Sequence, residues 1–110
     1  MQAILAYVTT RDAEEARRIG QILVEERLVA CVNILDGMRS MYWWEGQVQH
    51  EQEAVLMAKT RPELADALID RVKELHSYEC PCVVILPIDK GNPEFIKWIG
   101  EQTRGGESKV

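Results

Sequence analysis

Four side chains able to bind a metal ion occur close together in the segment 76–82. Cys80 and Cys82 are two residues apart, so both thiols project to the same side if this segment is extended. Thiolate and imidazole ligands suit copper(I) or zinc, but His-x3-Cys-x-Cys is not one of the usual closed zinc spacings. The segment therefore predicts a site for copper or another divalent metal ion, not required for folding, formed by His76, Glu79, Cys80 and Cys82.

The same residues also have a purely structural interpretation. Cys82 could begin a buried strand as a small apolar residue, and His76 could cap the C-terminal end of a helix. We favour this structural role for Cys82, whereas both roles are equally open for Cys80. The chain has three cysteines, the other being Cys31, and this odd number does not suggest a disulfide framework.

A second group of candidate binding residues follows from the motif MYWWEG at 41–46. Adjacent side chains of a strand point to opposite faces, so one domain cannot easily bury both Trp43 and Trp44. Carboxylates beside aromatic rings could line a pocket between subunits. For His50 and Glu51, the preferred alternative to a binding role is that they are charged residues on the exposed face of a long hairpin. The candidates are Trp43, Trp44, Glu45, His50, Glu51 and Glu53.

Hydrophobic periodicity and turn residues predict the elements that position these groups. The first half is expected to contain a strand (Gln2 to Val8), a helix capped by Thr9 or Thr10 (Arg11 to Arg27) and a strand interrupted at Asp36-Gly37 (Leu28 to Leu35, then Met41 to Trp44). A tight turn at Glu45-Gly46 leads into a third strand (Val48 to Lys59). A helix opened by a capping box (Thr60 to Glu63), a strand ended by Pro87 (Cys82 to Leu86) and a short helix from Asn92 then follow. This β-α-β-β-α-β order with an added C-terminal helix predicts an α+β, ferredoxin-like split β-α-β sandwich. We expect a single domain over residues 1–103 and a disordered polar tail over 104–110.

The predicted strands are apolar on both faces. The run from Cys82 to Leu86, for example, has no polar face, although helices cover only one side of such a sheet. The extended path from Val29 to Trp44 has 16 residues and would run roughly 50 Å, whereas a domain of this size is about 35 Å across. The hairpin must then bend at Asp36-Gly37, project to a neighbour, or both. We expect self-association, the alternative being a bulged and curled hairpin within a monomer.

Composition and charge limit the possible function classes. The 110-residue chain is 46% hydrophobic with a net charge of −5 and a pI near 5.0, which argues against nucleic acid or an anionic membrane as the main partner. No apolar segment approaches the roughly 20 residues that span a bilayer, and the N-terminus has no signal-peptide pattern. We therefore expect a cytoplasmic protein. No Ser-His-Asp or Cys-His arrangement with supporting context and no phosphate-binding glycine loop occurs, so we do not expect an enzyme.

Several short segments, in their order and spacing, are typical of one known family. They are LVACVNI at 28–34, YWWEG at 42–46, Lys59-Thr60, HSYECP at 76–81, and Leu86-Pro87-Ile88 followed by Trp98. With these residues the chain resembles the CutA family of divalent-cation-tolerance proteins, over nearly its whole length from about Ala3 to Trp98. No single segment is decisive, but together they make the resemblance specific.

The resemblance implies a ferredoxin-like subunit that forms a tight homotrimer, with the sheets meeting around the threefold axis and the hairpins interlocking. It also implies a role in tolerance to copper and other divalent metals, with copper binding in some members. Of the residues linked to copper in the family, only His76 is matched here, because Val8 stands at the position of the first-strand cysteine. Ser77 and Cys82 stand where the family usually has proline and glutamate.

The family architecture is also similar to that of PII signalling proteins, which sense small molecules in clefts between trimer subunits. A PII-like module for a small anionic ligand is therefore the alternative function, and it would need Lys59 or an arginine at its pocket. The resemblance implies that positions matching Glu53, Lys59 and Tyr78 lie near one another in the trimer. The expected inter-subunit pocket, for a metal ion or small ligand, comprises Tyr42, Trp43, Trp44, Glu45, Glu53, Lys59 and Tyr78.

Overall fold

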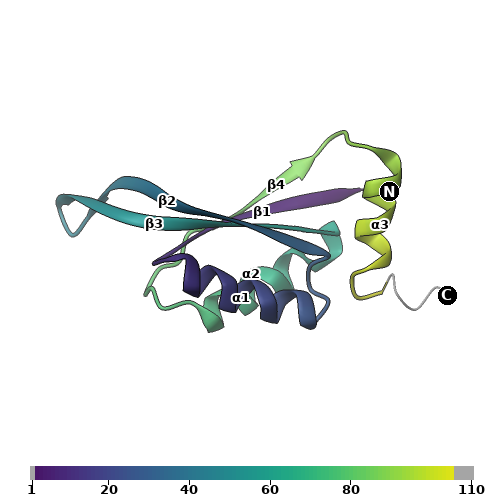
Figure 1. The fold of residues 1–110 in the computed structure, drawn as a ribbon, viewed down its shortest axis with the longest axis horizontal. Helices are drawn as coiled ribbons and strands as arrows, with labels where there is room; N and C mark the ends of the chain where they lie inside the picture. The colour runs from purple at the N-terminus through teal and green to yellow at the C-terminus, as the bar shows by residue number, and fades with distance from the viewer. Residues whose placement is uncertain (1, 106–110) are drawn as a thin grey trace.

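The computed structural model describes residues 2–105 and follows the predicted β-α-β-β-α-β order with an added helix. The elements are β1 (Ala3–Thr10), α1 (Ala13–Glu25), β2 (Cys31–Trp44), β3 (Gln47–Thr60), a 3-10 turn η1 (Pro62–Leu64), α2 (Ala65–Leu75), β4 (Val83–Ile88) and α3 (Pro93–Glu101). The strands form one antiparallel sheet in the order β2-β3-β1-β4. Helices α1 and α2 lie on the same side of this sheet, which confirms the predicted α+β class (Figure 1).

The hydrophobic core fills the space between the sheet and the two main helices. Along β1, Ile4, Ala6 and Val8 point into this space, as the two-residue period of a strand requires. Gly20 allows α1 to approach the sheet closely, because a Cβ atom there would lie 3.1 Å from Cγ2 of Val32. The buried apolar residues that the helices contribute are Ala16, Ile19, Leu23, Leu68 and Val72. No helix within residues 2–105 is long and apolar enough to cross a membrane.

Helix α1 begins later than the sequence suggested. Its N-cap is Asp12, whose Oδ1 accepts the backbone N–H of Glu15 at 2.8 Å, and the expectation of a cap at Thr9 or Thr10 is wrong. The reason is that β1 continues through both threonines, and Thr10 pairs with Ala54 of β3. The longer strand places Thr9 on the sheet, at the edge of the site described below.

Tertiary contacts also change two boundaries later in the chain. The Thr60 hydroxyl donates to the carbonyl oxygen of Leu28 at 2.7 Å, so the expected capping box does not form and η1 precedes α2 instead. Strand β4 continues past Pro87, because β4 is an edge strand and an edge tolerates a residue without an N–H. It begins at Val83 and leaves Cys82 exposed outside the strand, so the structural role that we favoured for Cys82 is wrong.

Strands β2 and β3 form a long hairpin that projects beyond the helices (Figure 1). The pairing register shifts between Leu35 and Met38, so the interruption expected at Asp36-Gly37 is a bulge inside one continuous strand. At the tip, Glu45 and Gly46 have φ angles of 51° and 78°, as a two-residue primed hairpin turn requires. The molecule measures 51 × 26 × 21 Å, so the hairpin both bends and projects.

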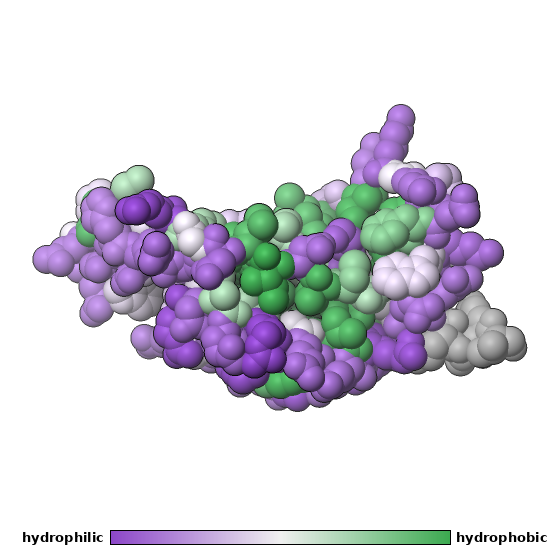
Figure 2. Space-filling model, viewed as in Figure 1, coloured by the Kyte–Doolittle hydropathy of each residue, from purple (hydrophilic) through white to green (hydrophobic). Residues whose placement is uncertain are grey.

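The sheet face opposite the helices is apolar as well. Leu35, Val84 and Leu86 are exposed on it, beside the partly buried Leu5 and Tyr7. Figure 2 shows hydrophobic residues reaching the surface across the middle of the molecule, flanked by hydrophilic residues over the hairpin. The predicted apolar character of both strand faces is therefore confirmed.

The C-terminal helix begins where the sequence predicted. Asn92 caps it by accepting the N–H of Glu94 at 3.1 Å, and Pro93 occupies the first turn. Beyond the helix, the backbone N–H of Arg104 donates to the carbonyl oxygen of Arg27 at 2.9 Å. Residues 106–110 of the predicted disordered tail lie outside the described residues, and the domain boundary at 103 stays a prediction.

The buried carboxylate of Glu15 ties the start of α1 to the α2–β4 loop. Its Oε1 accepts the backbone N–H of Arg11 and its Oε2 accepts that of Ser77, both at 2.9 Å, and the residue is only 1% exposed. Burial by itself would raise the pKa of Glu15, but the hydrogen bonds from Ser77 and Arg11 outweigh it, so the net shift of the pKa is downward. Because Ser77 belongs to the loop that carries the candidate metal ligands, this contact positions them.

We predict that Glu15→Gln lowers the free energy of unfolding by about 2 kcal/mol near neutral pH, because an amide offers only one acceptor to the two N–H groups. Since the folded-state pKa of Glu15 lies below the unfolded value, the carboxylate stabilises the fold fully above the unfolded pKa. That contribution is lost as the pH falls through the folded-state pKa. Urea unfolding at a series of pH values should therefore show the difference between wild type and variant shrinking in acid.

Glu14→Gln is the matched control for this measurement. Glu14 is exposed in the same helical turn and forms only a surface ion pair with Arg17, so its unfolding midpoint should match that of the wild type. Equal loss of stability in the two variants would mean that net charge, and not the buried contact, is responsible.

Candidate functional site

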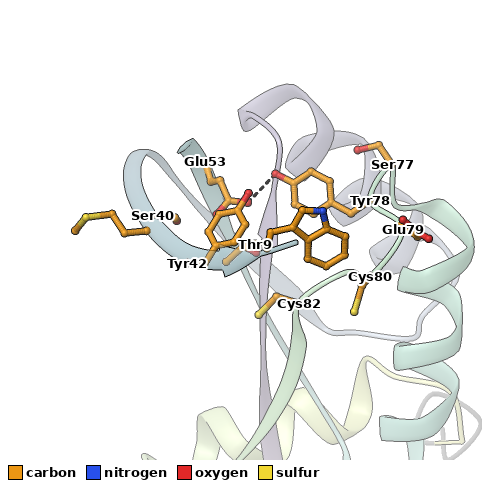
Figure 3. Close-up of a pocket in the computed structure, with 11 residues that line it drawn as sticks. Thr9, Ser40, Tyr42, Glu53, Ser77, Tyr78, Glu79, Cys80 and Cys82 are labelled. Atoms are coloured by element: carbon orange, nitrogen blue, oxygen red, sulfur yellow. Dashed lines mark hydrogen bonds between the residues drawn. The ribbon is translucent and has the colours of Figure 1, made fainter. Parts of the chain in front are cut away.

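A pocket of about 660 Å³ lies between the part of the hairpin beyond its bulge and the α2–β4 loop (Figure 3). Three segments that are remote in sequence form it: the end of β1 at Thr9, the hairpin of β2 and β3, and the loop at 77–82. Its walls therefore exist only when the hairpin has formed and α2 has docked on the sheet. The lining residues are Thr9, Ser40, Met41, Tyr42, Trp44, Glu53, Ser77, Tyr78, Glu79, Cys80 and Cys82.

His76 fixes the loop at the back of this pocket. It ends α2 as the C-cap residue, as the structural interpretation expected, and is 9% exposed. Its Nε2 lies 2.7 Å from the carbonyl oxygen of Thr9, and its Nδ1 accepts the backbone N–H of Tyr78 at 3.0 Å. Because a carbonyl only accepts, Nε2 carries the proton and the ring is held in one neutral tautomer. Both ring nitrogens are thus engaged within the chain.

Tyr78 and Glu53 form the polar centre of the pocket. The Tyr78 hydroxyl donates to Oε2 of Glu53 at 2.6 Å, and Glu53 is 6% exposed (Figure 3). Burial raises the pKa of Tyr78, and the hydrogen bond to Glu53 raises it further. Burial also raises the pKa of Tyr42, together with the charges of Glu51 and Glu53. Both phenols therefore stay neutral at physiological pH, and the Tyr78 proton remains on its oxygen as a donor.

The thiols of Cys80 and Cys82 lie at the exposed rim of the pocket and project to the same side of the loop (Figure 3). Glu79, between His76 and these thiols, also lines the pocket. Within residues 2–105, no three His, Cys, Asp or Glu side chains converge closely enough to hold a metal ion. This donor set does not fit a closed four-coordinate zinc site, whereas cysteine sulfur is a ligand type that suits the soft ion copper(I).

The structure brings together residues from both sequence-based predictions. Tyr42, Trp44, Glu53 and Tyr78 of the expected inter-subunit pocket line the same cavity as Glu79, Cys80 and Cys82 of the expected metal site. His76 lies behind the wall and does not line it.

Three residues of the expected inter-subunit pocket lie outside the cavity of the single chain. Trp43 is 74% exposed and does not line the cavity, whereas its neighbour Trp44 does and is 42% exposed. Glu45 lies in the turn at the hairpin tip. Lys59 lies further along β3, beside Leu5, and its Nζ donates to Oδ1 of Asn33 at 2.6 Å. His50 and Glu51 are exposed on the hairpin, in agreement with the alternative that we preferred for them.

Four lining residues were not among the sequence-based candidates: Thr9, Ser40, Met41 and Ser77. Thr9 was missed because it was assigned to a helix cap. Continuing the period of β1 from Leu5 and Tyr7 would have placed Thr9 on the sheet face that borders the pocket. Ser40 lies in the part of β2 between the two predicted strand segments, and Met41 belongs to the predicted segment Met41 to Trp44 but was not named as a site residue.

Comparisons with known proteins agree with this architecture. The sequence profile of the CutA1 divalent ion tolerance protein family matches residues 4–102. Protein CutA 1, chloroplastic, of Oryza sativa subsp. japonica is 44% identical over 102 residues, which make up 93% of this chain and 58% of that protein. The divalent-cation tolerance protein CutA of Thermus thermophilus is 47% identical over 99 residues, covering 90% of this chain and 96% of the relative. The chain thus spans just over half of the rice protein but nearly all of the Thermus protein.

Solved structures match equally well. CutA1 from Oryza sativa superposes with a TM-score of 0.92 at 43% identity, covering 96% of both chains. The Thermus thermophilus protein gives a TM-score of 0.89 at 44% identity, covering 92% of this chain and 98% of the other. The family and the Thermus thermophilus protein are named for tolerance to divalent ions, and none of these names states an enzymatic activity. The profile match over nearly the whole chain and the identities above 40% show that the chain belongs to the CutA1 divalent ion tolerance protein family.

Proposed function

We propose that this protein is a cytoplasmic divalent-cation tolerance module that acts as a homotrimer and binds a metal ion at the rim of the pocket. The observation that carries the metal assignment is the pair of exposed thiols, Cys80 and Cys82, at the mouth of a cavity that also contains Glu79 and Glu53. Two thiolates with nearby carboxylates attract cations, and the sulfur ligands select copper(I) among them. The chain's own groups would bind and orient the ion, and no catalytic step is proposed.

The apolar sheet face supports the trimer. Val84 and Leu86 are each nearly half exposed, and Leu35 is exposed on the same face. A contiguous apolar face on a single subunit is typical of a surface that another subunit covers. The projecting hairpin, on which Trp43 is largely exposed, offers a second surface for a neighbour.

The alternative is a PII-like module that senses a small ligand in a cleft between subunits. An anionic ligand would need a basic group, and Lys59 lies away from the cavity in a hydrogen bond with Asn33. The described residues that line the cavity include two carboxylates and no Lys, Arg or His. This charge distribution favours the cation-binding proposal over the anion-sensing alternative.

We predict that the reduced protein binds copper(I) and that the double change Cys80→Ser, Cys82→Ser weakens this binding at least tenfold, because serine hydroxyls are poor ligands for a soft ion. Calorimetric titration with copper(I), copper(II), zinc and common nucleotides tests this. Cys31→Ser is the matched control, since that cysteine lies on β2 outside the pocket and its loss should leave the affinity unchanged. If no metal binds with a dissociation constant below about 100 μM, a binding free energy of roughly 5.5 kcal/mol, the proposal of direct metal binding is contradicted.

We also predict that sedimentation equilibrium finds a trimer at micromolar concentration. Val84→Lys should shift the protein toward monomer, because it places a charge on the apolar face that the neighbour would cover. Val24→Lys makes the same chemical change at an exposed position of α1, on the helix layer, and should leave the trimer intact. A wild-type protein that is monomeric at this concentration contradicts the trimer.

A further inference from the structure

The pocket has an unusual balance of aromatic and charged side chains. Tyr42, Trp44 and Tyr78 supply three aromatic rings, and Glu53 and Glu79 supply two carboxylates. None of the described lining residues is basic. The cavity therefore has a negative potential and electron-rich walls, which together favour a positively charged ligand.

Glu53 is a buried carboxylate without a counter-ion in the described chain. Its single hydrogen bond comes from Tyr78, and none of the ion pairs within residues 2–105 involves it. A carboxylate that is 6% exposed loses most of its hydration, which is costly unless a positive charge or several donors compensate. Glu15, the other deeply buried carboxylate, has two backbone donors and Arg18 nearby at 3.8 Å. Glu53 thus lacks the compensation that Glu15 has.

The aromatic rings distinguish the kind of cation that this carboxylate would pair with. A metal ion is held by oxygen, nitrogen or sulfur atoms and gains little from rings, whereas an alkylated ammonium group packs its carbon atoms against them. Because their pKa values are raised, Tyr42 and Tyr78 keep neutral rings at physiological pH. A cavity of about 660 Å³ is of the size that binds small organic molecules.

We propose that the pocket binds a small organic cation of the alkylated ammonium class. The ammonium group pairs with Glu53 and packs against Tyr42, Trp44 and Tyr78. This ligand occupies the buried part of the cavity, whereas the thiols proposed for the metal ion are exposed at its rim. The inference goes beyond the proposed metal function and does not depend on it.

The test compares two ligands of nearly the same shape, choline and its uncharged carbon analogue 3,3-dimethylbutan-1-ol. Binding to the full-length protein is followed by calorimetry and tryptophan fluorescence in the presence of a metal chelator, so that no metal ion contributes. We expect choline to bind at least tenfold more tightly than the alcohol. Equal binding of the two, or no binding of choline up to about 10 mM, would overturn the proposal. Neither result would bear on the copper titration.

Two pairs of variants locate the site. Glu53→Gln should weaken choline binding about tenfold and leave the alcohol unaffected, because the amide keeps an acceptor for Tyr78 but loses the charge. Glu45→Gln removes the same charge at the hairpin tip, outside the lining, and should change neither affinity. Trp44→Leu should weaken choline binding severalfold, whereas Trp98→Leu, at a similarly exposed tryptophan of α3 outside the lining, should not.

The unfolding midpoint of each variant is compared with that of the wild type to check that the variant is folded. If Glu53→Gln unfolds, the comparison of choline with its uncharged analogue on the wild type still decides the question. Equal effects of Trp98→Leu and Trp44→Leu on choline binding would place the ligand elsewhere and overturn the assignment.

Discussion

The carboxylate of Glu15 is the contact on which the geometry of the site depends. One oxygen fixes the backbone ahead of α1 and the other fixes Ser77, so a single buried side chain joins the first helix to the loop after the second. His76 strengthens this connection by binding Thr9 through its ring. The loop that carries Tyr78, Cys80 and Cys82 is therefore attached to α1 through Glu15 and to β1 through Thr9, although it has no regular structure of its own.

This attachment explains why the ring of His76 lies behind the pocket wall. A histidine close to two cysteines resembles a metal site in sequence, but in the fold both of its nitrogens bind backbone groups. What remains available to a ligand is the carboxylates, the aromatic rings and the two thiols. These groups share one property: each of them attracts a cation, either hard or soft.

The sheet has two apolar faces for different reasons. One face is covered by α1 and α2 and forms the core of the subunit. The other face remains exposed in the single chain, with the hairpin extending past the helices. The pocket lies beside this second face, next to Thr9 of β1. A subunit that covered this face, as proposed above, would therefore lie on the same side of the sheet as the pocket.

The sequence by itself determined the order of the elements, the hairpin turn at Glu45-Gly46, the two apolar strand faces and the family, since local periodicity and turn residues report these directly. It did not show that Cys82 lies exposed outside β4. It could not determine that β1 continues through Thr10 or that Thr60 is buried, because these depend on Ala54 and Leu28, which are far along the chain. The candidate site was predicted as two separate groups of residues. Only the tertiary structure joined them into one pocket, because Glu79, Cys80 and Cys82 share a cavity with Tyr42 and Trp44 only when the loop docks against the hairpin.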